Sequence, residues 1–302
     1  MTQAATQAAR FRELMRCDGM VVAPGAYDCI TARLIERAGY DAVYMTGAGT
    51  AAMLGYPDFG LVTMSEMVDN ARRIATAVTV PVIADADTGY GNELNVVRTV
   101  REYEAAGVAG IHIEDQLYPK RAHYHGYQVH AVPTAEFVAK IRYACRQRDE
   151  TDPDFVIIAR TDTCREFGLE HAMLRINAAA EVGADMGLVF PRSREEAEAA
   201  PRLSTVPLVW VQSRGNRDGR PILPLGDLKE MGYRACIDAQ ILLAVAVHFQ
   251  KRALAEIVAT GSYSGLADAD FVALRKEIED LIGLDAYYQI EAETVEPDSR
   301  PG

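Results

Sequence analysis

Short apolar runs alternate with longer segments of helical periodicity along most of the chain. Four to six apolar residues bounded by turn residues are typical of a buried strand, whereas apolar residues spaced three and four apart are typical of a helix. Strands are predicted at residues 20–23, 42–45, 81–86, 110–113, 155–159, 186–190, 207–211 and 234–237. Helices are predicted at residues 11–15, 28–38, 65–78, 92–106, 134–148, 168–182, from 193 onwards, and at 225–231, 241–260 and 268–284.

The order of these segments predicts the fold. Eight strand-then-helix units follow one another, and a repeating β-α order implies a parallel sheet. Eight units within a domain of roughly 250 residues are typical of a closed (β/α)₈ TIM-type barrel. A doubly wound open sheet is the alternative, but no Gly-x-Gly-x-x-Gly follows the first strand. We therefore predict a barrel over residues 1–261 and a separate helical tail over residues 262–302.

Composition excludes several classes of partner. The 302 residues are 49% hydrophobic, enough for a large core, and carry a net charge of −12. An acidic chain without a basic patch is repelled by phosphate, so we expect neither a nucleic-acid nor a membrane partner. No apolar run reaches the ~20 residues that cross a bilayer. The N-terminus does not resemble a signal peptide and the five cysteines are scattered, so we expect a reduced, cytoplasmic protein.

Two carboxylates stand at the end of the third predicted strand. Asp85 and Asp87 are two residues apart, so on an extended chain they point to the same side and repel each other. A bound Mg²⁺ or Mn²⁺ would relieve that repulsion, because such ions prefer carboxylate and water oxygens. Glu114, at the end of the next strand, would add a third acid. The alternative is that these acids cap the following helix.

Other polar residues also follow the strands, where the active sites of such barrels lie. The glycine-rich stretch Thr46, Gly47 and Ala48 is predicted to be a loop whose backbone N–H groups hold a carboxylate or oxyanion. Arg160 offers a planar fork that matches a carboxylate. A metal, an oxyanion loop and an arginine together indicate a small anionic 2-oxo or 2-hydroxy acid as the substrate. The alternative is that Arg160 only neutralises the acids.

The segment 118–127 joins the fourth strand to its helix and contains two cations, two histidines and three tyrosines. Its length predicts a lid over the site. His123, His125 and the tyrosines are candidate proton-transfer groups. His112 lies inside the fourth strand, and we predict it to be a core residue.

Six motifs carry a resemblance to a known family. They are Tyr44-Met45-Thr46-Gly47-Ala48-Gly49-Thr50, Pro57-Asp58-Phe59-Gly60, Asp85-Ala86-Asp87-Thr88-Gly89-Tyr90-Gly91, Ile113-Glu114-Asp115-Gln116, Pro119-Lys120-Arg121 and Ile158-Ala159-Arg160-Thr161-Asp162. Together they resemble the isocitrate lyase/phosphoenolpyruvate mutase superfamily, from about Phe11 to Gly261.

The resemblance implies a (β/α)₈ barrel, a Mg²⁺-bound enolate of a 2-oxo acid, and cleavage or formation of the adjacent bond. It also implies a last helix swapped between subunits, in a homotetramer built as a dimer of dimers. By position, the metal-site acids are Asp85, Asp87 and Glu114, directly or through water. The substrate carboxylate loop is Thr46, Gly47 and Ala48, and Asp58 lines the site. The candidate catalytic residues are Lys120, His125, Arg160 and Tyr44.

The chain also departs from the family. Methylisocitrate lyases carry a catalytic Cys in the lid, but here Lys120-Arg121 is followed by Ala122, and His125 is our candidate to replace the thiol. The phosphonate branch usually has Glu-Asp-Lys and a lid Asn, so Gln116 favours the carbon–carbon branch. The lyases place Glu and Asn after strands six and seven. Here these positions are Arg192 and Gln212, which we predict to bind the distal part of the substrate.

Three functions follow from these observations. The first is a Mg²⁺-dependent lyase, decarboxylase or hydrolase acting on a carbon–carbon bond. The second is an enzyme that cleaves or rearranges a carbon–phosphorus bond. The third is a non-catalytic binding protein on the same barrel, favoured by the missing thiol and opposed by the retained acids and Arg160.

Overall fold

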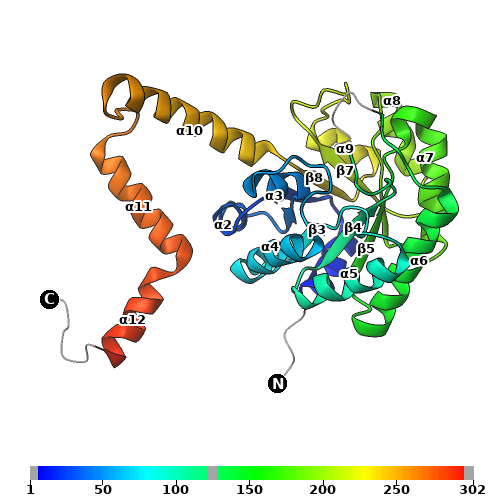
Figure 1. The fold of residues 1–302 in the computed structure, drawn as a ribbon, viewed down its shortest axis with the longest axis horizontal. Coiled ribbons are helices and arrows are strands. Elements are labelled where there is room, and N and C mark those ends of the chain that lie inside the picture. The colour runs from blue at the N-terminus through cyan, green and yellow to red at the C-terminus, as the bar shows by residue number, and fades with distance from the viewer. Residues whose placement is uncertain (1–5, 122–127, 296–302) are drawn as a thin grey trace. The chain divides into compact units, whose positions relative to one another are not determined.

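The computed structural model of this protein describes residues 6–121 and 128–295. Within them, eight parallel strands close into a barrel in chain order, with β8 hydrogen-bonded back to β1. Helices surround the strands (Figure 1). The strands are β1 (Val21–Ala26), β2 (Val43–Met45), β3 (Val82–Asp85), β4 (Gly110–Glu114), β5 (Val156–Arg160), β6 (Met186–Leu188), β7 (Leu208–Gln212) and β8 (Ala235–Asp238). The predicted (β/α)₈ barrel is confirmed.

The helices of the described residues mostly match the predicted ones. They are α1 (Gln7–Arg16), α2 (Cys29–Arg37), α3 (Gly47–Met53), α4 (Met64–Ala77), α5 (Glu93–Ala105), α6 (Thr134–Thr151), α7 (Cys164–Ala180), α8 (Arg194–Leu203), α9 (Leu225–Met231), α10 (Ile241–Thr260), α11 (Asp268–Ile282) and α12 (Leu284–Thr294). Two of them, α3 and α12, were not predicted. The glycine content of α3 suggested a loop, but its N-cap Thr46 accepts a hydrogen bond from Gly49 N and starts a helical turn.

Alternating side chains of the strands pack into two apolar layers. One layer fills the barrel interior and includes Tyr44, Ile83, Ile158 and Val211. The other lies between the strands and the helices and includes Met45, which immediately follows an interior residue. This alternation follows from the two-residue period of a strand. It means that the residue two positions beyond an interior residue points toward the barrel axis at the strand end.

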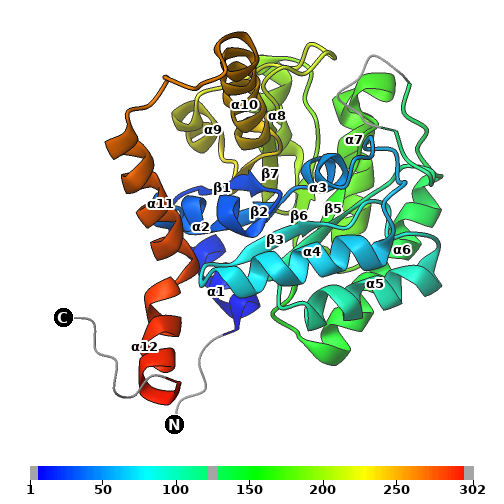
Figure 2. The ribbon, with the colours of Figure 1, turned by 60° about the vertical axis from the view of Figure 1, so that its left-hand side comes forward.

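The N-terminal end of the barrel is closed by α1 (Figure 2). Phe11 is fully buried in the interior layer, and Leu14 and Met15 pack against the same layer. Arg12 fixes the helix there, because its guanidinium donates to the carbonyl of Asp154 and forms an ion pair with Asp185, just before β5 and β6. The C-terminal end of the barrel is therefore the end that remains for a site.

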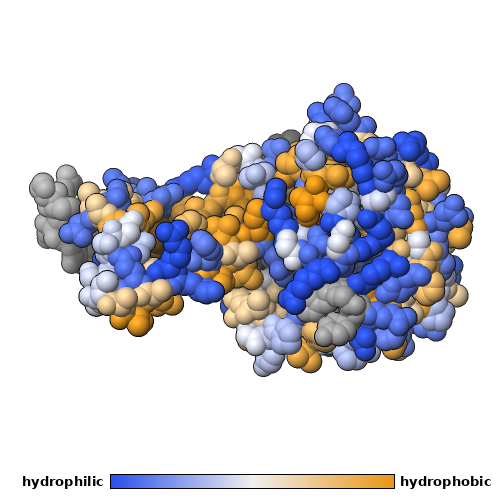
Figure 3. Space-filling view, turned by 90° about the horizontal axis from the view of Figure 1, so that it is seen from above, coloured by the Kyte–Doolittle hydropathy of each residue, from blue (hydrophilic) through white to orange (hydrophobic). Residues whose placement is uncertain are grey.

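The chain divides into two compact units, Met1–Leu243 and Ala244–Gly302. Most of α10 thus belongs with the tail, whereas we predicted the boundary after residue 261. The described part of the tail is helical, and apolar residues lie on its surface (Figure 3). Phe271, Leu274 and Ile278 are each 40–49% exposed. No helix among the described residues is long and apolar enough to cross a membrane.

Candidate active site

The site is built from the inward-facing positions at the C-terminal ends of the strands. Asp85 is two residues after Ile83, Arg160 is two residues after Ile158, and His112 and Glu114 hold the corresponding positions of β4. All four of these polar side chains are buried. The apolar barrel interior therefore ends in a layer of buried charged and polar groups.

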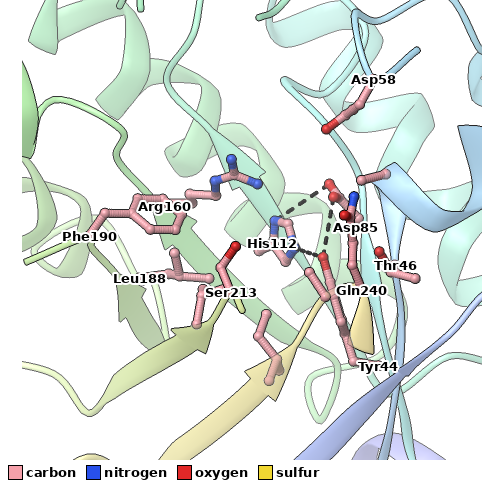
Figure 4. A pocket seen from close by; sticks show the side chains of 14 residues that line it. Tyr44, Thr46, Asp58, Asp85, His112, Arg160, Leu188, Phe190, Ser213 and Gln240 are labelled. Carbon is pink, nitrogen blue, oxygen red and sulfur yellow. Dashed lines mark hydrogen bonds and ion pairs between the residues drawn. The ribbon is translucent and has the colours of Figure 1, made fainter. Parts of the chain in front are cut away.

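Three of them, Asp85, His112 and Arg160, line a small cavity of about 30 Å³ (Figure 4). Its polar wall consists of Tyr44, Thr46, Asp58, Asp85, His112, Arg160, Ser213 and Gln240. Its apolar wall consists of Ala48, Leu188, Phe190, Val211, Ile237 and Ala239. Charged and apolar side chains are neighbours in this lining, as Arg160 and Phe190 show in Figure 4.

Asp85, Tyr44 and His112 form a buried polar cluster with two hydrogen bonds and one longer contact, which Figure 4 shows as dashed lines. The Tyr44 hydroxyl lies 3.3 Å from Asp85 Oδ2 and 3.0 Å from His112 Nε2. His112 Nδ1 lies 3.6 Å from Asp85 Oδ1. Our prediction that His112 is only a core residue is therefore incomplete, because this buried side chain also lines the cavity.

Lys120 joins two further acids. Its Nζ lies 2.9 Å from Asp58 Oδ1 and 2.5 Å from Asp87 Oδ1, and its side chain is only 2% exposed. Three of the predicted residues, Lys120, Asp58 and Asp87, are thus brought together.

Arg160 joins Glu114 to Asp162. Its Nη2 lies 2.8 Å from Glu114 Oε2, while Nε and Nη2 each donate to one oxygen of Asp162 at 3.0 Å. The guanidinium also lies over the ring of Phe190, 5.1 Å from its centroid. These contacts fix the plane of the guanidinium beside the cavity.

Burial and neighbouring charges shift the pKa values of these groups in different directions. Burial alone would raise the pKa of Asp85, but His112, Lys120 and Arg160 lower it below its usual range. Burial lowers the pKa of His112 to about 4, so its imidazole is neutral near pH 7. Burial raises the pKa of Asp87 to about 6 and that of Glu114 well above its ordinary value, although Lys120 and Arg160 act against it. The positive charge present in the site is therefore insufficient for all of its carboxylates.

The donor set fits a hard divalent cation. Asp87 Oδ1 and both oxygens of Glu114 are buried and lack a well-directed hydrogen bond, even though Lys120 and Arg160 lie at ion-pair distance. Among the described residues, no three Asp, Glu, His or Cys side chains converge closely enough to ligate one ion directly. Mg²⁺ usually keeps several waters and takes only one or two carboxylates, so these acids suit it better than an ion that needs an all-protein shell.

The start of α3 packs tightly against Asp85. A Cβ on Gly47 would lie 2.3 Å from Asp85 Oδ2, which only a glycine avoids. Thr46 and Ala48 line the cavity on either side. The three residues predicted to hold a carboxylate therefore lie beside the acids, at the start of a helix instead of in a loop.

Two predicted substrate residues lie away from the cavity wall. Arg192 forms an ion pair with Asp218 at 2.8 Å. Gln212 accepts a hydrogen bond from Trp210 Nε1 and donates to the carbonyl of Leu223. Alternation along β7 explains the position of Gln212. Val211 faces the barrel interior, so Gln212 faces the opposite side. The next inward-facing residue is Ser213, which lines the cavity.

The sequence analysis did not identify the roles of His112, Phe190, Ser213 and Gln240 in lining the cavity. For His112 the sequence did contain a signal, because it lies two residues before Glu114 on the same strand and so faces the same side. Our candidate proton-transfer residues His123, Tyr124 and His125 lie outside the described residues.

With this geometry established, comparison with known proteins identifies the family. Residues 11–258 match the family described as phosphoenolpyruvate phosphomutase. The chain belongs to this family. The predicted membership of the isocitrate lyase/phosphoenolpyruvate mutase superfamily is thereby confirmed, and with it the predicted class of enzyme.

The relatives within the superfamily include both carbon–carbon and phosphonate enzymes. A 2,3-dimethylmalate lyase of Eubacterium barkeri is 42% identical, over 94% of this chain and 96% of the relative. A solved structure of oxaloacetate acetylhydrolase with 3,3-difluorooxalacetate has a TM-score of 0.89 and 34% identity, covering 95% of this chain and 97% of that one. A phosphonopyruvate hydrolase in complex with oxalate and Mg²⁺ has a TM-score of 0.83 and 29% identity, covering 96% of this chain and all of that one.

The contact between Gly47 and Asp85 gives a direct test of the site. We expect Gly47→Ala to displace the Asp85 carboxylate and to weaken Mg²⁺ binding by about 10- to 100-fold, the usual effect of disturbing a group that orients a ligand. Isothermal titration calorimetry measures this. Gly226→Ala is the matched control, because a Cβ there meets no atom within 4 Å. Equal Mg²⁺ affinity in the two variants would contradict the assignment of Asp85.

Proposed function

We propose that this protein is a Mg²⁺-dependent lyase that cleaves a carbon–carbon bond of a small 2-hydroxy acid and releases a 2-oxo acid. The observation that carries the proposal is the buried group of acids at the strand ends, in which Asp87 and Glu114 are short of positive charge. Such perturbed carboxylates in a barrel mouth are typical of a functional site. The scattered cysteines, all free in the structure, agree with the reducing, cytoplasmic setting that we propose.

Different residues of the site would bind different parts of the substrate. Arg160 is positioned to pair with the substrate carboxylate, since its side chain lines the cavity and its guanidinium is held in plane by Asp162. Thr46 and Ala48 border the same space. The Thr46 N–H is bonded to the Ala26 carbonyl, so backbone N–H groups for the substrate would come from Gly47 and Ala48 in the first turn of α3. Lys120 and the Tyr44 hydroxyl stand on the acid side, where they can hold the substrate's oxygen atoms by hydrogen bonds.

Asp85, Asp87 and Glu114 would hold the divalent ion, in part through water. The ion supplies positive charge where negative charge develops on the oxygen next to the broken bond. Tyr44 and His112 keep Asp85 oriented, and the neutral imidazole adds no charge that would compete with a cation.

The apolar residues of the cavity lining favour a particular kind of substrate. Leu188, Phe190, Val211 and Ile237 line the cavity, and Phe190 lies directly against the Arg160 guanidinium, 5.1 Å from its ring centroid. Such residues suit alkyl substituents on the substrate. A malate that carries methyl groups, as in the name of the 2,3-dimethylmalate lyase, has this character. Hydrolysis of oxaloacetate and phosphonate cleavage are the alternative reactions, since similar structures carry those names.

An activity panel tests the proposal. The protein with Mg²⁺ is offered alkyl-substituted malates, other 2-hydroxy diacids, oxaloacetate and phosphonopyruvate, and release of the 2-oxo acid, oxalate or phosphate is measured. We expect turnover of a substituted malate and its loss on chelation of the metal. Turnover of phosphonopyruvate alone would replace the proposal with the phosphonate alternative, and no turnover with intact Mg²⁺ binding would favour a binding protein.

Asp87 tests the link between metal and turnover. We expect Asp87→Ala to abolish Mg²⁺ binding in calorimetry together with activity, because the variant loses one of the three acids and leaves Lys120 with a single partner, Asp58. The control is Asp69→Ala, which removes an exposed carboxylate paired with Arg73. Unchanged Mg²⁺ affinity in Asp87→Ala would show that the site is misplaced.

His125 tests the source of the proton. We propose that it replaces the missing thiol, because histidine exchanges protons near neutral pH. General acid–base groups contribute about 10²–10⁴ in rate, so we expect His125→Ala to lower kcat by that factor with Mg²⁺ affinity intact. His130→Ala, at an exposed position nearby, is the control. A loss below about threefold in kcat would remove His125 from the mechanism and leave His123 and Tyr124 as candidates.

We also propose that the chain forms a homotetramer, a dimer of dimers in which the tail helices are exchanged. The support is the apolar face of α11, whose Phe271, Leu274 and Ile278 are half exposed. We expect light scattering to give the mass of four chains and Leu274→Asp to lower it, whereas Lys276→Asp on the same helix leaves it unchanged. A monomeric intact chain would overturn this proposal.

A further inference from the structure

Gln116 is a buried residue between the two basic groups of the site. It follows β4 by two residues and is 1% exposed. It also pairs with Ala131 in an isolated antiparallel bridge, which brings together the two ends of the segment that follows β4. It does not line the cavity, so any effect that it has on the substrate must act through other residues.

The two halves of the Gln116 amide contact different parts of the site. Its Nε2 donates to Asp162 Oδ2, and Asp162 in turn accepts two hydrogen bonds from Arg160. Its Oε1 accepts a hydrogen bond of 2.8 Å from the backbone N–H of Arg121. Arg121 is the neighbour of Lys120, whose Nζ binds Asp58 and Asp87.

We propose that Gln116 is a positioning residue that sets both basic groups, Arg160 through Asp162 and Lys120 through the backbone of Arg121. The proposal rests on the proposed function in one respect, namely that Arg160 binds the substrate carboxylate. An amide suits this place because it donates and accepts at once. A lysine could serve only Asp162, and an apolar side chain could serve neither partner.

The loss of either contact has a distinct consequence. Without its donor, the Asp162 carboxylate loses its bond from Gln116 and keeps those from Arg160, so the plane of the Arg160 guanidinium is less firmly fixed. Without its acceptor, the N–H of Arg121 loses its hydrogen bond to Gln116, and the chain around Lys120 is held less firmly. Asp162 is buried, and a buried polar group that loses a hydrogen bond carries a penalty, so the effect on Arg160 should be measurable as well.

Two variants separate these consequences. Gln116→Lys keeps a donor toward Asp162 and removes the acceptor, and Gln116→Met removes both. The first readout is the affinity for oxalate in the presence of Mg²⁺, measured by calorimetry, because oxalate carries the carboxylate that Arg160 would bind. The second is the rate at which trypsin cleaves the substrate-free protein after Arg121, which reports how firmly that backbone is held.

The expected pattern is asymmetric. Gln116→Met should weaken oxalate binding about tenfold or more, and Gln116→Lys should restore it to within about twofold of the unchanged protein. Both variants should be cleaved several-fold faster after Arg121. Gln147→Met is the matched control, since Gln147 is equally buried and hydrogen-bonded but joins Arg101 to Thr151 away from the site. It should change neither readout.

Other outcomes overturn the proposal. Equal oxalate affinity in the Met and Lys variants, or cleavage rates no faster than those of Gln147→Met, would show that Gln116 is a structural residue only. Failure of oxalate to bind the unchanged protein would count against the proposed function instead. The cleavage comparison needs no ligand, so in that case unchanged rates would still overturn the role of Gln116.

Discussion

The site depends on a shortage of positive charge in a buried place. Asp58, Asp85, Asp87 and Glu114 share Lys120 and Arg160, and Arg160 also serves Asp162. Desolvation makes each uncompensated carboxylate costly, which is why burial raises the pKa of Asp87 and Glu114. The pKa of Asp85 is lowered, because the charges around it and a hydrogen bond from the Asp87 N–H outweigh its burial. A divalent cation would supply the missing positive charge. The barrel tolerates the shortage because its large apolar layers stabilise the fold independently of the mouth.

The backbone around the acids is also strained, and it is supported from outside the site. Asp87 and Tyr90 have φ angles of 47° and 59°, a left-handed conformation that non-glycine residues rarely adopt. The loop is held by Lys140, which donates to the Thr88 carbonyl at 3.3 Å, and by Thr99, which donates to the Gly89 carbonyl at 3.2 Å. These supports come from α6 and α5. The helices that cover the barrel therefore also fix the direction of a carboxylate at its mouth.

The features of the fold that depend on local periodicity could be predicted from the sequence. Eight strands, their order and the acids at their ends follow from apolar runs and alternation, and the structure agrees. The predictions differ from the structure where a shift of one residue decides whether a side chain faces the cavity, or where a single contact decides the local structure. We predicted Gln212 as a substrate residue, but Ser213 and not Gln212 lines the cavity, because a strand end cannot be located to one residue from composition. The α3 helix was missed because a capping hydrogen bond outweighs the low helix propensity of its glycines. Arg192 was expected at the cavity, and its pairing with Asp218 depends on a loop distant in sequence.

That loop explains how the apolar wall is kept free of charge. Asp218 pairs with both Arg192 and Arg220, and Arg220 lies over the ring of Phe190, 4.6 Å from its centroid. Arg160 also lies within cation–π distance of the same ring. Phe190 thus contacts Arg160, which is on the cavity wall, and Arg220, which is not. Asp218 pairs with Arg192 and Arg220, and neither of these arginines lines the cavity. Among the described residues, Arg160 is the arginine that does. A substrate whose carboxylate pairs with Arg160 and whose alkyl substituents lie against the apolar residues of the lining is matched by this arrangement.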